Sequence, residues 1–304
     1  MRIGSRGSSL ALTQTNVVAK ALRDANPGLQ TEILIIRTKG DIMQDTALAR
    51  IGGKGLFVKE IEEALLAGTV DIAVHSLKDM PAELPEGLEI GATPERGDPR
   101  DAWIAADGRR IEDAPPGARI GTGSLRRGLQ VRRMVPQAEI VPIRGNLDTR
   151  IRKIASERLA GVVVAAAGLS RMGWTDRATQ ILAPDVMLPA VGQGILAVEM
   201  RSGDRGVREI LQPINDAATG LAAKAERAFL RALGGGCQLP VAAYAESREG
   251  RLRITGLVGS ADGSAAIRDA MEGPDESAAA MGTEVAERIL RAGGRELLAA
   301  VYGK

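Results

Sequence analysis

Apolar residues in this chain follow two alternating patterns, short continuous runs and longer stretches in which they recur at helical spacing. Short runs bounded by glycine, proline or polar residues predict buried strands, whereas a 3.6-residue period predicts amphipathic helices. Strands are predicted over residues 2–5, 31–37, 70–74, 118–121, 139–143, 162–166 and 195–200. Strands that alternate with helices in this way are typical of α/β folds with mixed, mainly parallel sheets.

Helices are predicted between these strands. The first begins at Ser8 or Ser9, and its inner face is formed by Leu10, Val17, Val18, Ala21 and Leu22. The helix over about 56–66 leaves Lys59 and three glutamates on its other surfaces, while its inner face is formed by Phe57, Ile61, Ala64 and Leu65. A later helix begins near Leu125, and Asn146 is expected to cap the one after it.

Two polar, proline-bearing segments, 94–100 and 188–194, interrupt the series and are predicted to cross between two α/β lobes. The strand over 195–200 is expected to return to the first lobe. Three domains are therefore predicted: 1–95 together with 195–213, then 100–190, and finally a small α+β domain over 217–304. The third comprises a helix over 216–233, strands over 241–245, 252–258 and 265–271, and helices over 276–290 and 295–301.

Length and composition narrow the class of protein. The chain has 304 residues, of which 44% are hydrophobic and 26% charged, and this length exceeds what one core usually supports. Because no export signal or apolar membrane-spanning stretch is evident, we expect a cytoplasmic protein without a membrane partner. The single cysteine, Cys237, and the single histidine, His75, cannot make a metal site unaided, so no metal is predicted.

Arginine dominates the basic residues. Eight of the 40 are lysine, which leaves 32 arginines, and residues 119–158 hold nine arginines and one lysine against three acidic residues. Arginine grips carboxylates and phosphates through two parallel hydrogen bonds. A solvated basic helix face is the simpler explanation, but the arginines lie where predicted strands end, at the sheet edge where ligands bind in open α/β folds. The block therefore predicts a polyanionic ligand.

Cys237 follows three consecutive glycines, Gly234 to Gly236. A lone thiol is often a small buried hydrophobe. One glycine is enough to end the preceding helix, so the other two suggest an open approach to the sulfur for a bulky group. The polar segment 38–55 is long enough to be a lid or a disordered loop.

Several strings together resemble the porphobilinogen deaminase (hydroxymethylbilane synthase) family. They are residues 6–12 (RGSSLAL), 52–57 (GGKGLF), 75–79 (HSLKD), 123–127 (GSLRR), 144–146 (RGN), 188–194 (LPAVGQG) and 235–238 (GGCQ). The resemblance covers about residues 2–238, and the third, fourth and last strings are the most specific. It implies two lobes like those of periplasmic binding proteins, followed by a C-terminal domain.

By this resemblance, Cys237 would hold a dipyrromethane cofactor through a thioether, and Asp79 would be the catalytic carboxylate that stabilises positive charge when ammonia leaves porphobilinogen. Four porphobilinogen molecules would be joined to the cofactor and released as hydroxymethylbilane. The resemblance places cofactor contacts at Lys78, Asp79, Thr122, Ser124, Arg126, Arg127, Arg144, Gly145 and Gly168. It places substrate contacts at Arg6, Ser8, Gln14, Ser76, Arg144, Arg150, Arg171 and Gln193. Lys54 and Lys59, in or beside the lid, would meet the growing chain. A monomer is expected.

Two other classes of protein fit parts of the sequence. A nucleic-acid binder would also use a basic block, but no aromatic residue lies between Trp103 and Trp174 to stack on bases, so no nucleic acid is predicted. A two-lobed carboxylate-binding module without catalysis would explain the lobes and the arginines. It assigns no role to the glycines before Cys237.

Overall fold

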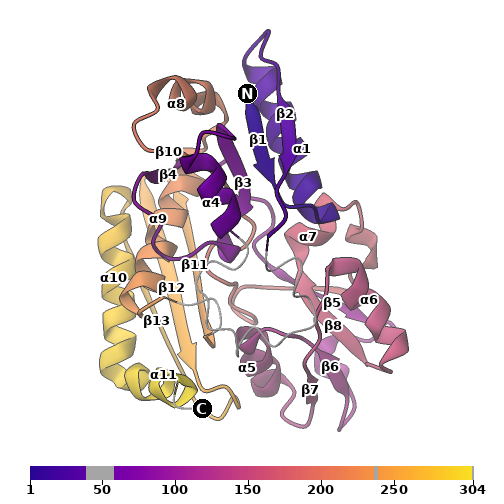
Figure 1. Ribbon diagram of the computed structural model, residues 1–304. Helices are drawn as coiled ribbons and strands as arrows, with labels where there is room; N and C mark the ends of the chain where they lie inside the picture. Colours follow the sequence, from indigo (N-terminus) through magenta and orange to yellow (C-terminus); the bar gives the residue numbers. More distant parts are fainter. Residues whose placement is uncertain (39–57, 236–238, 303–304) are drawn as a thin grey trace.

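The computed structural model describes residues 1–38, 58–235 and 239–302, and Figure 1 shows three groups of elements. The lid segment, with Phe57 and Lys54, and the cysteine loop with Cys237 lie outside these residues. Among the described residues, no helix is long and apolar enough to cross a membrane.

The first lobe is built on a five-stranded sheet with the order β2-β1-β3-β10-β4. Its strands are β1 (Arg2–Ser5), β2 (Glu32–Ile35), β3 (Ile72–Ser76), β4 (Leu88–Ala92) and β10 (Leu196–Arg201), and its helices are α1 (Ser9–Ala25), α4 (Lys59–Leu66) and α8 (Arg205–Leu211). β10 runs antiparallel to β3 and β4, while β1, β2 and β3 are mutually parallel. The strand predicted after the second crossing thus returns to the first lobe.

The second lobe repeats this topology with the order β7-β6-β8-β5-β9. Its strands are β5 (Asp101–Ala105), β6 (Arg119–Gly121), β7 (Glu139–Val141), β8 (Gly161–Ala165) and β9 (Gln180–Leu182), and its helices are α5 (Leu125–Met134), α6 (Leu147–Ser156) and α7 (Ala166–Arg171). Here β5, which follows the first crossing, is the antiparallel strand. Each crossing therefore delivers the one reversed strand of a lobe, a structural repeat that the sequence does not reveal.

The third unit is an antiparallel sheet, β11-β12-β13, covered by helices. Its elements are α9 (Ala217–Ala232), β11 (Val241–Arg248), β12 (Arg251–Gly259), β13 (Ala266–Pro274), α10 (Ala278–Ile289) and α11 (Arg295–Tyr302), drawn in orange and yellow in Figure 1. Gly282 lets α10 approach α9 closely, because a Cβ there would collide with the carbonyl oxygen of Ala225. The predicted α/β class with two lobes and an α+β C-terminal unit is confirmed.

Several local predictions were wrong. β2 is not buried but is the edge of its sheet, where Ile35 is 58% exposed. Glu62 of α4 faces inward rather than outward and is buried with the inner-face residues Ile61 and Leu65. Asn146 precedes α6, but its side chain makes no capping hydrogen bond. The sequence patterns also missed β4, β5, β9 and α8, because most of these elements are short or amphipathic.

Candidate functional site

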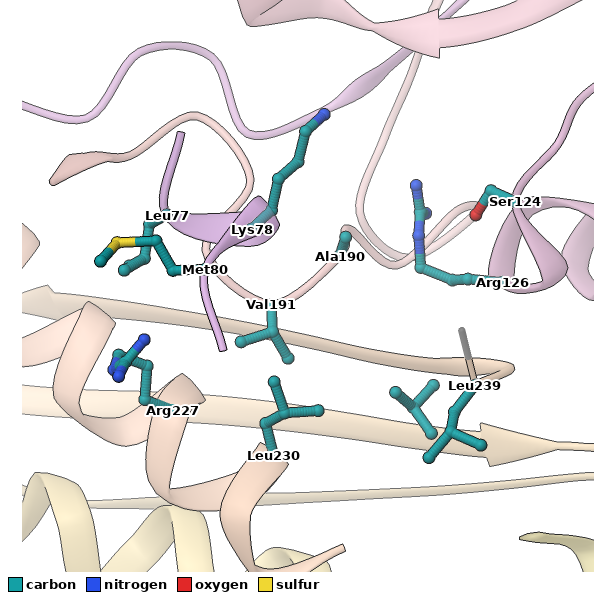
Figure 2. A pocket seen from close by; sticks show the side chains of 11 residues that line it. Leu77, Lys78, Met80, Ser124, Arg126, Ala190, Val191, Arg227, Leu230 and Leu239 are labelled. Atoms are coloured by element: carbon teal, nitrogen blue, oxygen red, sulfur yellow. The ribbon is translucent and has the colours of Figure 1, made fainter. Parts of the chain in front are cut away.

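A pocket lies where both lobes, the second crossing and the third unit meet, and it holds about 520 Å³ of space, open solvent at its mouth included. Its walls are formed by Leu77, Lys78, Met80, Ser124, Arg126, Ala190, Val191, Arg227, Leu230, Leu239 and Val241. Figure 2 shows the charged ends of Lys78 and Arg126 extending to one side, away from the apolar group of Val191, Leu230 and Leu239. The pocket thus combines cationic donors with an apolar floor.

Lys78 and Asp79 are held by a short 3-10 helix, Leu77–Asp79, directly after β3. Leu77 and Met80 on either side are buried and anchor this turn, and the Leu77 amide donates to the carbonyl oxygen of Ile195 at 3.0 Å. Gly192 of the second crossing packs against it, with φ of +71° and only 2.8 Å between a hypothetical Cβ and Leu77 Cγ. Asp79 itself is exposed, so its carboxylate is available to a ligand.

Lys78 is half-buried, and burial lowers the pKa of its ammonium to about 8. The Asp79 carboxylate opposes this effect, whereas the Arg127 guanidinium adds to it. In the same way, burial lowers the pKa of Arg150 and the Asp79 carboxylate opposes this effect, while burial, and to a smaller extent the Arg150 guanidinium, lowers the pKa of Arg127. The structure therefore brings these four predicted site residues from two lobes into one electrostatic cluster.

Arg126 and Arg127 lie in the first turn of α5, where Ser124 Oγ accepts a hydrogen bond from the Arg127 amide at 3.4 Å. Both side chains are buried against Asp101, the first residue of β5. Arg126 Nη1 lies 2.7 Å from Asp101 Oδ2, and Arg127 Nη2 lies 2.8 Å from Asp101 Oδ1. The carboxylate is itself buried, and the two guanidinium groups hold the pKa of Asp101 well below its usual range. Burial lowers the pKa of Arg127 to about 10. The protein thus supplies one carboxylate, that of Asp101, as a counter-ion for these two arginines.

Gln193 and Arg171 lie at the second crossing. Gln193 Nε2 donates to Asp101 Oδ1 at 3.1 Å and to the carbonyl oxygen of Pro99 at 2.7 Å, so it joins the two crossings. Arg171 Nη2 donates to the carbonyl oxygen of Gly194 at 2.6 Å, and burial lowers the pKa of Arg171 to about 10. Both residues therefore hold the connection between the lobes.

The remaining predicted contacts fall into two groups. Arg150 Nε donates to the carbonyl oxygen of Gly145 at 2.8 Å, and Arg144 lies half-buried at the same turn before α6. Asp148, in the first turn of α6, pairs with Arg152 at 2.8 Å on the surface.

At the first strand end, Ser8 caps α1 beside half-buried Arg6. Gln14 Nε2 donates to Ser76 Oγ at 2.9 Å, which ties α1 to the end of β3 next to Lys78. Thr122 Oγ1 accepts from the Ser124 amide at 3.2 Å and shapes the turn into α5. All three contacts position backbone at strand ends.

Some predicted residues are not brought to the pocket. Lys59 is exposed and lies 3.9 Å from Glu63 on its own helix, and Gly168 lies inside α7, against Leu147 and Leu10. Cys237 and Lys54 lie outside the described residues. The chain on both sides of Cys237 does reach the site: Leu239 lines the pocket, and Gly235 packs near Ala82, three residues after Asp79.

Sequence reasoning missed Asp101, Arg227 and Glu226. Arg227 donates to the carbonyl oxygens of Pro81 and Ala82 at 3.0 and 2.9 Å, so α9 grips the loop after Asp79. Glu226 is fully buried and accepts from Arg96 at 2.7 Å, from the Gly192 amide at 2.6 Å and from the Ala245 amide at 2.8 Å. The only sequence signal for Glu226 and Arg227 was charge inside an apolar helix. Asp101 had none beyond its place before an apolar run.

Two α/β lobes of identical topology, joined by two crossings and with cationic side chains at strand ends, define the class of two-lobed α/β proteins. The chain belongs to the porphobilinogen deaminase family. Residues 1–209 match the family model "Porphobilinogen deaminase, dipyromethane cofactor binding domain", and residues 221–291 match "Porphobilinogen deaminase, C-terminal domain". The resemblance found in the sequence is thereby confirmed, and the first model names the cofactor that it implied.

Relatives of this chain carry the same name. It is 58% identical over 298 residues to the porphobilinogen deaminase of Syntrophus aciditrophicus, with 98% of this chain and 97% of that one covered. It is 49% identical to that of Syntrophobacter fumaroxidans, with 99% and 98% covered. Among solved structures, the ancestral cationic amino acid solute binding protein AncCDT-1 covers 71% of this chain and 86% of its own, with a TM-score of 0.42 and 16% identity. The last likeness is too distant to bear on function.

Proposed function

We propose that this protein is an enzyme that joins four porphobilinogen molecules head to tail, with loss of ammonia, and releases hydroxymethylbilane for tetrapyrrole synthesis. The observation that supports it most is the cationic cluster around exposed Asp79, beside a pocket whose wall continues into the Cys237 loop. Each porphobilinogen carries two carboxylates on a flat apolar ring. Such a ligand suits a pocket with cationic donors on one side and apolar side chains on the other.

The residues of the pocket fit a covalent dipyrromethane. Lys78, Ser124 and Arg126 offer donors to carboxylates, and Leu77, Met80, Leu230 and Val241 offer apolar walls to pyrrole rings. Arg126 Nε is buried and has no acceptor within the described parts of the chain, so one donor there remains for a ligand. When bound, the cofactor supplies the pyrrole carbon to which the first substrate is joined. Cys237, two residues before Leu239, is the proposed attachment point.

Asp79 is the proposed catalytic residue. Loss of ammonia from porphobilinogen leaves positive charge on the pyrrole, and a nearby carboxylate stabilises that charge more than it stabilises the neutral ring. The turn that carries Asp79 is fixed by buried Leu77 and Met80 and by Arg227, so its carboxylate needs little reorganisation during the reaction. Lys78 and Arg150 beside it would hold substrate carboxylates near the reacting ring.

The other sequence-based expectations are also proposals. Lys54 and Lys59 are proposed to meet the growing chain as it leaves the site. The further residues proposed to contact the cofactor or the substrate are Arg6, Ser8, Gln14, Ser76, Thr122, Arg127, Arg144, Gly145, Gly168, Arg171 and Gln193. The three domains keep their proposed bounds, which agree with the membership of β10 in the first sheet and of β5 in the second. A cytoplasmic monomer without nucleic-acid or membrane partners is proposed on the sequence grounds given above.

Mass spectrometry of the denatured protein tests this function. We expect an intact mass that exceeds the sequence mass by two linked pyrrole units, together with consumption of porphobilinogen and formation of a linear tetrapyrrole. A carboxylate-binding module without catalysis would bind the compound but show neither the mass increment nor the product. That outcome would refute the proposed function.

A further inference from the structure

Asp101 is a fully buried carboxylate at the point where the chain enters the second lobe. As the first residue of β5 it pairs with Ala165 of β8 and Leu182 of β9, so its backbone is fixed on both sides. Its two oxygens accept from Arg126 Nη1 at 2.7 Å, Arg126 Nη2 at 3.2 Å, Arg127 Nε at 2.9 Å and Gln193 Nε2 at 3.1 Å. One carboxylate therefore contacts both guanidinium groups, while Arg126 Nη1 also donates to the carbonyl oxygen of Leu188 at 2.8 Å and Arg127 Nη2 to Gln193 Oε1 at 3.4 Å.

These arginines need such a partner. They stand in the first turn of α5, where the helix dipole already places partial positive charge, and their side chains are only 4% and 7% exposed. A buried cation without a counter-ion is strongly unfavourable, and two adjacent buried cations repel each other as well. Asp101 opposes both effects because its carboxylate lies between the two guanidinium groups.

The pairing is incomplete by one charge. One carboxylate faces two guanidinium groups, and the charge of the nearby Lys78 ammonium is opposed by the Asp79 carboxylate. Arg126 Nε, on the guanidinium that lines the pocket, is buried without an acceptor among the described residues. The cluster thus retains both a positive charge and an oriented N–H donor, which are the features that bind a carboxylate.

We propose that Asp101 is a positioning residue that aims Arg126 at a pyrrole carboxylate in the pocket, holds Arg127 beside it, and leaves one positive charge of this arginine pair without a counter-ion. The proposal rests on the function given above. Gln193 extends the arrangement, since its amide joins Asp101 to the carbonyl oxygens of Pro99 and Arg100 in the first crossing. The orientation of the guanidinium groups therefore depends on both connections between the lobes.

Asp101→Asn tests the role of the charge, and Asp98→Asn is the matched control. Asp98 lies three residues earlier in the same crossing and pairs with Arg100 at 2.7 Å on the surface. The full-length variants would be purified, incubated with porphobilinogen and denatured, and their intact masses would be measured by mass spectrometry. Circular dichroism and the thermal midpoint would report the fold. We expect the pyrrole-loaded fraction of Asp101→Asn to fall about tenfold or more, while Asp98→Asn loads like the unaltered protein.

Asp101→Glu keeps the charge but moves it by one methylene group. We expect this variant to fold and to acquire the pyrrole increment. Its KM for porphobilinogen should rise about threefold or more while kcat stays nearly unchanged, because the substitution alters the orientation of the arginines and not the reacting groups. A purely structural ion pair would lower the thermal midpoint and leave KM alone. Asp101→Glu also decides the matter if Asp101→Asn does not fold.

Failure of this inference is distinguishable from failure of the function. A folded Asp101→Asn protein that loads fully with the original KM, or a loaded Asp101→Glu protein with the original KM, overturns the role of Asp101 alone. An unaltered protein that carries no pyrrole increment and leaves porphobilinogen intact overturns the proposed function, and the role of Asp101 with it.

Discussion

Asp79 differs from its neighbours in exposure: its carboxylate is open to solvent, while Leu77 and Met80 beside it are buried. A rigid turn that presents one exposed charge is how a scaffold places a catalytic group, because the backbone is held by packing and only the side chain faces the ligand. At the scale of single residues, the charge and the reach of Asp79 can be separated by substitution.

Asp79→Asn retains the size of the side chain but removes its charge. We expect this variant to bind porphobilinogen but to turn over about a hundredfold slower or worse, and Asp79→Glu to retain a fraction of the activity. Single-turnover assays measure this, with Glu83→Gln as control because Glu83 is an exposed carboxylate four residues later. Near-normal turnover in Asp79→Asn would assign the catalytic carboxylate to another residue.

Cys237→Ser addresses attachment. Serine is a much poorer nucleophile than cysteine near neutral pH, so we expect the variant to fold and to lack the pyrrole mass increment. Intact mass after denaturation is the measurement. A serine variant that kept both increment and activity would show that Cys237 has only a structural role.

At the scale of elements, α4 packs against β3 and β10 through buried ionisable groups. His75 Nε2 of β3 lies 3.1 Å from Glu199 Oε2 of β10, and Glu62 of α4 faces them. Burial, and then the Glu199 carboxylate, raise the pKa of Glu62 to about 7, while His75 lowers it and Glu63 raises it slightly. Glu62 thus links α4 to β3, the strand that leads into the turn with Asp79.

The sign of the resulting pH dependence is set by the raised pKa. The folded state holds the Glu62 proton more tightly than the unfolded state, so its contribution is greatest below about pH 4.5 and is lost as the pH rises through about 7. Glu62→Gln should flatten the stability profile between pH 5 and 8 by on the order of 1 kcal/mol, because the folded variant has no buried carboxyl group there to ionise. Urea unfolding at several pH values measures this, and identical profiles would contradict it.

At the scale of the whole molecule, Glu226 joins all three units. Glu226 lies on α9 of the third unit, and its carboxylate accepts hydrogen bonds from Arg96 in the first crossing and from the Gly192 amide in the second. Arg96 also donates to the carbonyl oxygen of Gln193 at 2.9 Å. The Arg96 guanidinium lies 5.0 Å from the ring centroid of Tyr244 on β11. This junction holds the third unit, which carries the cysteine loop, against both connections between the lobes.

Glu226→Gln removes the charge at this junction while retaining the size of the side chain. We expect a loss of about 3 kcal/mol in the free energy of unfolding, because Arg96 would remain buried without its counter-ion. Glu284→Gln is the control: because Glu284 pairs with Arg288 on an exposed face of α10, its substitution should leave the free energy of unfolding nearly unchanged. Chemical denaturation compares the two. Equal losses would show that the junction is not a stabilising contact.

The family and the order of most elements were predictable from the sequence, but β4, β5, β9 and α8 were not. Apolar periodicity is a local property, and strand ends in α/β folds gather polar groups, so the patterns placed β1, β3, α5 and α9 near their observed bounds. The cationic residues of the site were identified for the same reason. The local patterns predicted burial wrongly in two places: β2 is an edge strand, and the side chain of Glu62 faces inward.

Partnership between distant residues was decided by the tertiary structure alone. Asp101 meets Arg126 because β5 enters the second sheet in reverse beside β8, and Glu226 meets Gly192 because α9 packs over both crossings. Neither pairing has a local pattern, since it depends on sheet order and register rather than on the residues between. The sequence therefore determined which charges this protein carries to its pocket, and the packing of the lobes decided which of them are neutralised there and which remain for a ligand.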